Sequence, residues 1–189
     1  MPRKYNAKQK EYLLSPDRVK TLDTHRVMSF LPLMVYQDVA DVGSGPGYFS
    51  IPLAKFLFDG QVLALDIHKQ MLQAVDEAAD KLKLSNITTM QSTEAKLMLT
   101  KDSVDGALLS FILSDTAKPE KVLKDTKSAI RNGGWMAIIE WKTYGLQGGP
   151  NKTSFTGEDQ FKSMALKTGF RFTGRYHVSE SHYMLVFST

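Results

Sequence analysis

The chain has 189 residues, of which 42% are hydrophobic and 23% are charged, a balance typical of one globular domain. It contains no cysteine, which excludes disulfide bonds, thiolate metal sites and cysteine nucleophiles. No apolar run approaches the ~18 residues that a membrane-spanning helix needs. Because the first residues also lack the apolar segment of a secretory signal, we expect a cytoplasmic protein.

The formal net charge of +4 is concentrated at one end of the chain. Residues 1–20 carry six basic and two acidic side chains, and the rest of the chain carries 18 of each. Enzymes that act on nucleic acids usually have a basic surface on the folded domain itself. The distribution therefore argues against a nucleic-acid partner and favours a solvated basic leader.

The first expected helix begins at Ser15, has Pro16 near its first position, and ends before Pro32. Its apolar stripe would consist of Val19, Leu22, Val27 and Phe30. A strand is expected over residues 37–42, followed by a glycine-rich turn and a helix over 48–57. Residues 61–66 form a short apolar run that ends in an acid, which is typical of a buried parallel strand.

The alternation of strands and helices continues along the chain. The further segments are expected to be helix 68–84, strand 87–91, strand 104–113, helix 117–131 and strand 135–141. The sequence Asn-Gly-Gly at 132–134 predicts a glycine-type end for the helix before it.

The last part of the chain is expected to contain a loop, a helix and a hairpin. The loop covers residues 142–155, and Thr156 is the expected N-cap of a helix that ends at Gly169. Strands 170–178 and 182–187 would pair as a hairpin. Together these elements predict an α/β fold: a doubly wound, mostly parallel, seven-stranded Rossmann-like sheet with an antiparallel strand from the C-terminal hairpin.

The turn after the first strand, at residues 41–47, reads Asp-Val-Gly-Ser-Gly-Pro-Gly. Glycines allow positive φ and let a ligand approach the main chain closely. A dinucleotide motif would require glycine or alanine at position 48, where this chain has Tyr48. Asp41 would also repel a diphosphate, whereas a net cationic sulfonium cofactor would tolerate it. The turn therefore favours S-adenosylmethionine over a nicotinamide dinucleotide.

Asp66 ends the second strand, 19 residues beyond Gly47. A carboxylate at this place can accept hydrogen bonds from both hydroxyls of a ribose. Two structural alternatives remain open: Asp66 could only cap the next helix, and Asp41 could only stabilise the turn. The combination of strand, turn, helix and second acid nevertheless predicts a cofactor site.

These segments resemble the class I S-adenosylmethionine-dependent methyltransferases, above all the compact type that includes the ubiquinone/menaquinone-biosynthesis methyltransferases. The resemblance covers roughly residues 37–189, and we expect these to form the S-adenosylmethionine-binding domain, after a leader and helical segment at 1–36. The segments that carry the resemblance are residues 39–47, 62–67, 102–111, 123–135 and 165–170.

The resemblance implies roles for particular residues. Gly43 and Gly45 would lie beside the methionine part of the cofactor, with Asp41 near its amino group. Asp66 would hold the ribose and Ile67 would pack on the adenine. The remaining candidate contacts are Ser44, Gly47, Tyr48, Phe49, Met71, Thr93, Glu94, Ala95, Ser110 and Phe111.

One segment departs from the family pattern, which often has Gly-Asp-Ala after the third strand. Residues 92–95 read Ser-Thr-Glu-Ala here, so either Thr93 or Glu94 would contact the adenine amino group. Among the candidate contacts named above, Phe49 is also expected to pack in the hydrophobic core.

A sulfonium methyl group is already activated, so a catalytic base is optional and no catalytic residue is assigned. Asp115, Glu140 and His68 are candidates near strand ends. For Asp115 and His68 the alternative is a helix cap, and for Glu140 an ion pair. His177 and His182, in the expected hairpin, fit surface or packing positions better. Four histidines without ligand spacing indicate no metal site.

The leading hypothesis is methyl transfer to a small-molecule acceptor by in-line displacement, in a monomer or homodimer. The acceptor would be shaped by the N-terminal segment and the loop at 142–155, which contain aromatic residues. One alternative is an RNA or protein acceptor docked by the basic leader, and another is a non-catalytic S-adenosylmethionine-binding module. A nicotinamide dehydrogenase is the fourth, and Tyr48 argues against it.

Overall fold

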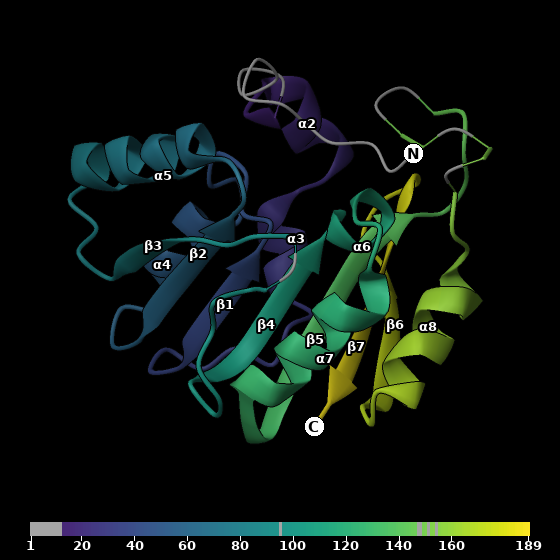
Figure 1. The fold of residues 1–189 in the computed structure, drawn as a ribbon. Helices are drawn as coiled ribbons and strands as arrows, with labels where there is room; N and C mark the ends of the chain where they lie inside the picture. The colour runs from purple at the N-terminus through teal and green to yellow at the C-terminus, as the bar shows by residue number, and fades with distance from the viewer. Residues whose placement is uncertain (1–12, 95, 147–148, 151, 154) are drawn as a thin grey trace.

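The computed structural model describes residues 13–94, 96–146, 149–150, 152–153 and 155–189. Seven strands form one sheet in the order β3-β2-β1-β4-β5-β7-β6 (Figure 1). The strands are β1 (Asp38–Val42), β2 (Gln61–Asp66), β3 (Ile87–Gln91), β4 (Val104–Ser110), β5 (Ile130–Trp141), β6 (Arg171–His177) and β7 (His182–Ser188). Strands β1 to β5 pair in parallel, whereas β7 is antiparallel to β5 and β6. The expected fold class is confirmed.

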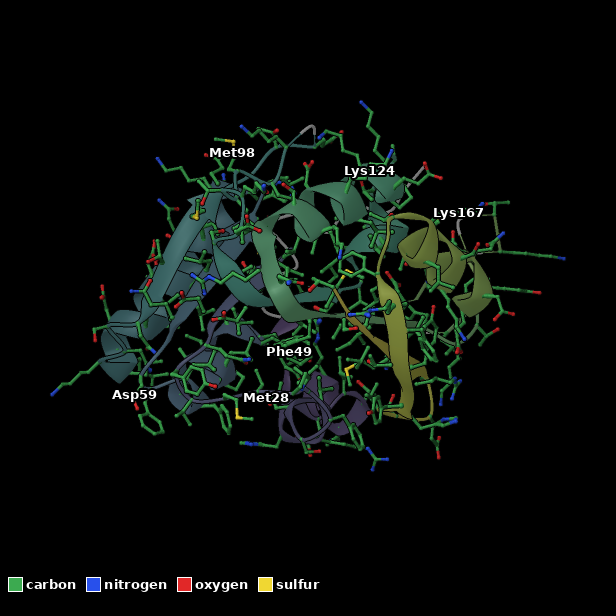
Figure 2. The ribbon with its side chains drawn as sticks, turned by 90° about the horizontal axis from the view of Figure 1, so that it is seen from below. Met28, Phe49, Asp59, Met98, Lys124 and Lys167 are labelled. Carbon is green, nitrogen blue, oxygen red and sulfur yellow. The ribbon has the colours of Figure 1, made fainter. Side chains whose placement is uncertain are left out.

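Helices cover both faces of the sheet, and each face has its own hydrophobic core. The helices are α2 (Pro16–Thr21), α3 (Thr24–Met28), α4 (Ser50–Phe56), α5 (Lys69–Leu82), α6 (Ile112–Asp115), α7 (Pro119–Ala129) and α8 (Glu158–Lys167). One core contains residues of α7 and α8, and the other contains residues of α3 and α4. Met28 and Lys124 accordingly lie on opposite sides of the sheet, while Phe49 lies inside the molecule (Figure 2).

The strand order reverses between β1 and β4. From β1 the chain proceeds to β2 and β3 on one side, and β4 then begins the other half of the sheet. In open α/β sheets, ligands bind beyond the carboxyl ends of the strands at such a switch point. Helices α2 and α6 lie at this same edge of the sheet (Figure 1). The fold therefore predicts a ligand site between the glycine-rich turn after β1 and the segment after β4.

The N-terminal segment forms two short helices, so the expectation of one helix ending before Pro32 is wrong. The N-cap of α2 is Ser15, as expected, and its hydroxyl accepts from the Arg18 amide at 3.4 Å. The chain then turns at Asp23, whose carboxylate caps α3 by accepting from the His25 amide at 2.8 Å. A good N-cap residue inside the apolar pattern thus starts a second helix. The side chain of Val19, part of the expected stripe, lies outside the described residues.

Two other boundaries differ from expectation. Strand β4 ends at Ser110, because Phe111 has a left-handed backbone with φ of 62° and turns the chain into α6. Helix α7 ends at Ala129 with no glycine cap, and residues 132–134 belong to β5. A Cβ on Gly134 would lie 2.4 Å from the Asp105 carbonyl oxygen. This glycine therefore permits a close strand contact and does not end a helix.

The last helix also begins one residue later than expected. The N-cap of α8 is Gly157, not Thr156, and the Gly157 amide donates to the Gln160 side chain at 3.2 Å. Gly169 follows the helix with a positive φ of 93°, which fits its expected role as the residue that ends the helix. Among the described residues no helix is both long enough and apolar enough to cross a membrane.

Candidate functional site

A cavity of about 460 Å³ lies beyond the carboxyl ends of β1, β2 and β4. Twelve of the expected cofactor contacts line it: Gly43, Ser44, Gly45, Tyr48, Phe49, Asp66, Ile67, Met71, Thr93, Glu94, Ser110 and Phe111. Asp41 and Gly47 are not among the lining residues, and Ala95 lies outside the described residues. Lining a cavity is a fact of geometry, and cofactor binding by these residues stays a prediction.

The glycine-rich turn forms one wall of the cavity. Gly43, Gly45 and Gly47 have φ values of 74°, 54° and 92°, which side chains rarely adopt. The amides of Gly43 and Ser44 both donate to the Leu65 carbonyl oxygen at 2.8 Å, and this ties the turn to β2. A Cβ on Gly45 would find only Leu13 Cδ1 nearby, at 3.8 Å. Because Gly45 and Leu13 both line the cavity, this Cβ would occupy ligand space.

Asp66 joins the end of β2 to the glycine-rich turn. Its Oδ2 accepts from the Gly45 amide at 2.9 Å, and its Oδ1 accepts from the His68 amide at 2.8 Å. Burial raises the pKa of Asp66, while these two amide hydrogen bonds lower it in part. Each carboxylate oxygen can accept a second hydrogen bond. The side chain is therefore held rigidly and keeps acceptor capacity for a pair of ligand hydroxyls.

Asp41 lies behind the turn and is fully buried. Its Oδ2 accepts from the Ser50 hydroxyl at 2.6 Å, and its Oδ1 has no hydrogen-bond partner among the described residues. Burial raises the pKa of Asp41 to about 6, against the opposing effect of the Ser50 hydrogen bond. An unpartnered buried carboxylate oxygen is costly, and a nearby ligand cation would relieve that cost.

The cavity also has an aromatic group in its lining, which we call the aromatic mouth and define as Tyr48, Phe111 and the guanidinium of Arg18. The Arg18 Cζ lies 4.6 Å from the Tyr48 ring centroid and 5.7 Å from the Phe111 ring centroid. The Tyr48 hydroxyl donates to the Leu22 carbonyl oxygen and so ties the N-terminal segment to this wall. All three side chains of the mouth line the cavity.

Behind Phe111 stand two further rings. The ring centroids of Phe111 and His182 are 5.1 Å apart, and those of His182 and Trp141 are 4.3 Å apart. Burial, followed by the charge of Arg18, lowers the pKa of His182 to about 4, so this ring is neutral at neutral pH. His182 is thus a buried packing residue, consistent with the sequence analysis.

Glu140, at the end of β5, does not line the cavity. The ion pair that was one alternative for Glu140 is not formed among the described residues: its carboxyl accepts from the Ser114 amide at 3.1 Å and from the Ser114 hydroxyl. Burial raises the pKa of Glu140 to about 8, and the nearby charge of Asp115 raises it further. The Tyr183 hydroxyl, on the strand paired with β5, is buried without a hydrogen-bond partner among the described residues. These groups form a buried polar layer, separate from the cavity.

The helix caps expected of His68 and Asp115 take a different form. His68 is the N-cap residue of α5, but its side chain makes no capping hydrogen bond. The N-cap of α7 is Lys118, whose amide is bound by the Thr116 hydroxyl at 3.2 Å. Both His68 and Asp115 line the cavity.

Thr93 and Glu94 also line the cavity, so the geometry leaves both available to an adenine. The Thr93 hydroxyl accepts from the Lys96 amide at 3.1 Å within a tight turn.

Sequence reasoning missed several residues of the cavity. The missed residues are Leu13, Arg18, Val42, Pro46, Ser92, Leu97, Ile112, Thr116, Ala117 and Val122. Pro46 lies inside the glycine-rich turn, and Ser92 adjoins Thr93, so proximity to a motif was the available signal for both. Arg18 is distant in sequence from every motif. In the part of the chain that the structure describes, no group of three acidic or histidine side chains could hold a metal ion.

The cavity fits a nucleoside that carries an amino acid. The glycine-rich turn leaves space that a side chain would fill, and Asp66 presents a paired acceptor for ribose hydroxyls. The unpartnered oxygen of Asp41 suits a positive charge. This fold with this site defines a nucleoside-binding α/β domain of the methyltransferase type.

Residues 37–168 match the sequence model of the methyltransferase-domain family, so the chain belongs to this family. Its members use S-adenosylmethionine as the methyl donor. A solved S-adenosylmethionine-dependent methyltransferase from Aquifex aeolicus is 25% identical and superposes with a TM-score of 0.90, with 97% of this chain and 98% of that chain covered. The PH0226 protein from Pyrococcus horikoshii is 17% identical with a TM-score of 0.76 over 98% and 99% of the two chains, a likeness of fold.

Two kinds of curated protein are similar to parts of the chain. The ubiquinone/menaquinone biosynthesis C-methyltransferase UbiE of Haemophilus ducreyi is 28% identical over 110 residues, which cover 56% of this chain and 41% of that protein. The ribosomal RNA small subunit methyltransferase G of Coxiella burnetii is 24% identical over 127 residues, which cover 65% and 59%. The chain therefore spans less than two thirds of the length of either relative.

Proposed function

We propose that the protein transfers the methyl group of S-adenosylmethionine to a small-molecule acceptor. The observation that carries the proposal is one cavity that combines the glycine-rich turn, the rigidly held Asp66 and the aromatic mouth. The fold and family supply the cofactor class, and the mouth supplies the surface against which an acceptor would bind.

In this proposal residues 37–189 form the binding domain and the turn at 43–47 lies along the methionine part of the cofactor. Asp66 accepts from the two ribose hydroxyls, while Ile67 and Met71 pack on the adenine. Thr93 or Glu94 binds the adenine amino group. The support for these roles is that all five side chains line the same cavity as Gly43 and Gly45.

Bound S-adenosylmethionine supplies a sulfonium methyl group that needs no further activation. The protein then has to orient an acceptor atom in line behind that methyl group and exclude water. Tyr48 and Phe111 offer flat apolar faces for this, which favours a planar acceptor. His182 is neutral and separated from the cavity by packing on Phe111, so it shapes the wall without moving a proton.

The likeness to UbiE supports a small-molecule acceptor, and the likeness to ribosomal RNA small subunit methyltransferase G supports RNA as the second candidate. Charge favours the first, because the basic excess lies within residues 1–20 and the remaining chain is formally neutral. A deletion of residues 1–12 separates the two. RNA as the acceptor requires salt-dependent RNA binding that the deletion abolishes.

The decisive test of the cofactor site is calorimetric titration with S-adenosylmethionine, S-adenosylhomocysteine and NAD. We expect the first two to bind and NAD not to bind. Asp66→Ala should weaken S-adenosylhomocysteine binding by about 100-fold, because it removes two hydrogen bonds to a charged group. Asp66→Asn, which keeps the size and one acceptor, should lie between wild type and Asp66→Ala.

Asp76→Ala is the matched control, since this exposed carboxylate on α5 binds Thr89 outside the cavity. It should leave nucleoside affinity unchanged. Saturable NAD binding with no response to the sulfonium compound would overturn the proposed function. So would tight cofactor binding without methyl transfer to any member of a panel of planar phenols, quinols and heteroaromatic amines or to RNA, which would favour a non-catalytic module.

A further inference from the structure

The hydrogen bonds made by the backbone of the glycine-rich turn leave it without a free amide for an anion. The amides of Gly43 and Ser44 donate to Leu65, the amide of Gly45 donates to Asp66, and that of Gly47 donates to the Ser44 carbonyl oxygen. The remaining residue of the turn is Pro46, which has no N–H. In many anion sites the backbone amides of a glycine-rich turn bind the negative group. Here residues 43–47 use all of theirs internally.

The amino-acid part of S-adenosylmethionine carries both an ammonium and a carboxylate. Asp41, buried behind the turn with one unpartnered oxygen, attracts the ammonium. The carboxylate is attached to the same carbon as the ammonium and needs a positive partner of its own, and the turn provides none. Among the described residues that line the cavity, Arg18 is the one arginine or lysine.

Arg18 is placed to meet this need. Its guanidinium lies over the Tyr48 ring at 4.6 Å and the Phe111 ring at 5.7 Å, and both rings line the cavity. A guanidinium stacked on an aromatic face directs its N–H groups outward in its own plane, where a carboxylate can bind two of them at once. Two rings also restrict its rotamers before a ligand arrives, which lowers the entropy lost on binding.

The charge of Arg18 acts on titratable groups from three separate segments of the chain. It lowers the pKa of Asp41 and of Tyr48, although burial raises both, and it lowers the pKa of His182. Asp41 lies in β1, Tyr48 precedes α4 and His182 begins β7. The guanidinium of the aromatic mouth therefore lies close enough to Asp41 for the two charges to interact.

We propose that Arg18 binds the α-carboxylate of the cofactor's methionine part, as the positive partner of the buried Asp41. This inference rests on the proposed function, because it assumes that S-adenosylmethionine occupies the cavity. It assigns a positioning role to the N-terminal helix α2, which lies outside the segment matched by the family. The cofactor's amino acid is then held by side chains from α2 and β1, and the turn between them supplies shape only.

The test compares two nucleosides that differ in the amino-acid part. S-adenosylhomocysteine carries the carboxylate, whereas methylthioadenosine has the same adenosine and thioether without the amino acid. In calorimetric titrations Arg18→Gln should weaken S-adenosylhomocysteine binding by at least ~10-fold, the loss of a paired charge-assisted hydrogen bond. It should leave methylthioadenosine affinity unchanged. Arg18→Lys, which keeps the charge without the planar pair of donors, should give an intermediate loss.

Arg26→Gln is the matched control. This arginine also lies over an aromatic ring, at 6.0 Å from Phe30, and its Nη2 donates to the His177 carbonyl oxygen, but it does not line the cavity. It should change the affinity for neither nucleoside. Retained methylthioadenosine binding by Arg18→Gln serves as the check that this variant is folded.

Three outcomes would overturn the inference. Unchanged S-adenosylhomocysteine affinity in Arg18→Gln would show that Arg18 does not reach the carboxylate. Equal losses for both nucleosides would assign Arg18 to the structure of the mouth. Intact cofactor affinity with a raised KM for a carboxylate-bearing acceptor would assign it to the acceptor. Wild-type protein that binds neither nucleoside would instead overturn the proposed function itself.

Discussion

The two halves of the sheet bury titratable groups at the same edge but treat them differently. In the β1–β2 half, Asp66 accepts from backbone amides and lines the cavity. In the β5–β7 half, Glu140 binds Ser114 and stays outside the cavity. Burial raises the pKa of both acids. A buried acid with a raised pKa is therefore a binding group only where the fold also gives it an open face.

The largest expected effect that distinguishes the two halves is a change in how the free energy of unfolding depends on pH in the Glu140→Gln variant. Folding raises the pKa of Glu140 from 4.5 to about 8, so between these values the folded state keeps a proton that the unfolded state has lost. The wild type therefore loses stability as pH rises through this range. Glutamine does not titrate, and the variant should gain up to about 4 kcal/mol relative to wild type between about pH 5 and pH 8.

Urea unfolding at a series of pH values measures this gain. Glu120→Gln, an exposed acid on α7, is the control and should follow the wild-type curve. Affinity of Glu140→Gln for S-adenosylhomocysteine should match that of wild type. If the unfolding free energies of Glu140→Gln and wild type ran parallel across the pH series, the prediction would be contradicted. A loss of cofactor affinity in Glu140→Gln would contradict the separation of the polar layer from the cavity.

Gly45→Ala tests the β1–β2 half, and here we expect the substitution to lower both cofactor affinity and stability. The added Cβ enters cavity space near Leu13, so we expect cofactor affinity to fall by ~10-fold or more, about 1.4 kcal/mol. The positive φ of 54° costs stability as well, on the order of 1 kcal/mol. Calorimetry gives the first quantity and thermal unfolding gives the second.

Gly145→Ala separates these two effects. Gly145 has a φ of 80°, and a Cβ there would meet nothing within 4 Å, so it carries the backbone strain alone. Its stability loss should be similar to that of Gly45→Ala, with no loss of affinity. If both variants kept full affinity, the turn at residues 43–47 would not lie against the ligand.

The comparison also explains what could be predicted from sequence. The strand, glycine-rich turn and Asp66 form a local pattern with fixed spacing, since one backbone path creates the whole wall. The aromatic mouth has no such pattern, because Arg18, Tyr48 and Phe111 come from three separated segments. Their meeting depends on how α2 docks, and no spacing in the sequence encodes that.

The incorrect helix boundaries have different origins. Asp23 lies within the apolar pattern of the expected single helix, and its carboxylate caps a second helix there. The glycines at 133 and 134 fit a helix end by local rules, but Gly134 is needed for the close approach of the Asp105 carbonyl oxygen. A local cap thus decided the first boundary, and a long-range contact between strands decided the second.

The smallest expected effect concerns the docking of the N-terminal segment on the cavity wall. The Tyr48 hydroxyl donates to the Leu22 carbonyl oxygen, and this bond is buried. Tyr48→Phe keeps the ring beneath Arg18 but leaves that carbonyl oxygen without this donor, at a cost of about 1 kcal/mol. We expect thermal unfolding to occur about 2–4 °C lower. Amide hydrogen exchange at Leu22 should also become faster, whereas exchange in β1 should not, because its strand pairing is unaffected.

Tyr36→Phe, which alters an exposed tyrosine, is the control. Unchanged exchange at Leu22 together with an unchanged unfolding temperature would mean that packing, and not this hydrogen bond, holds α2 over the cavity.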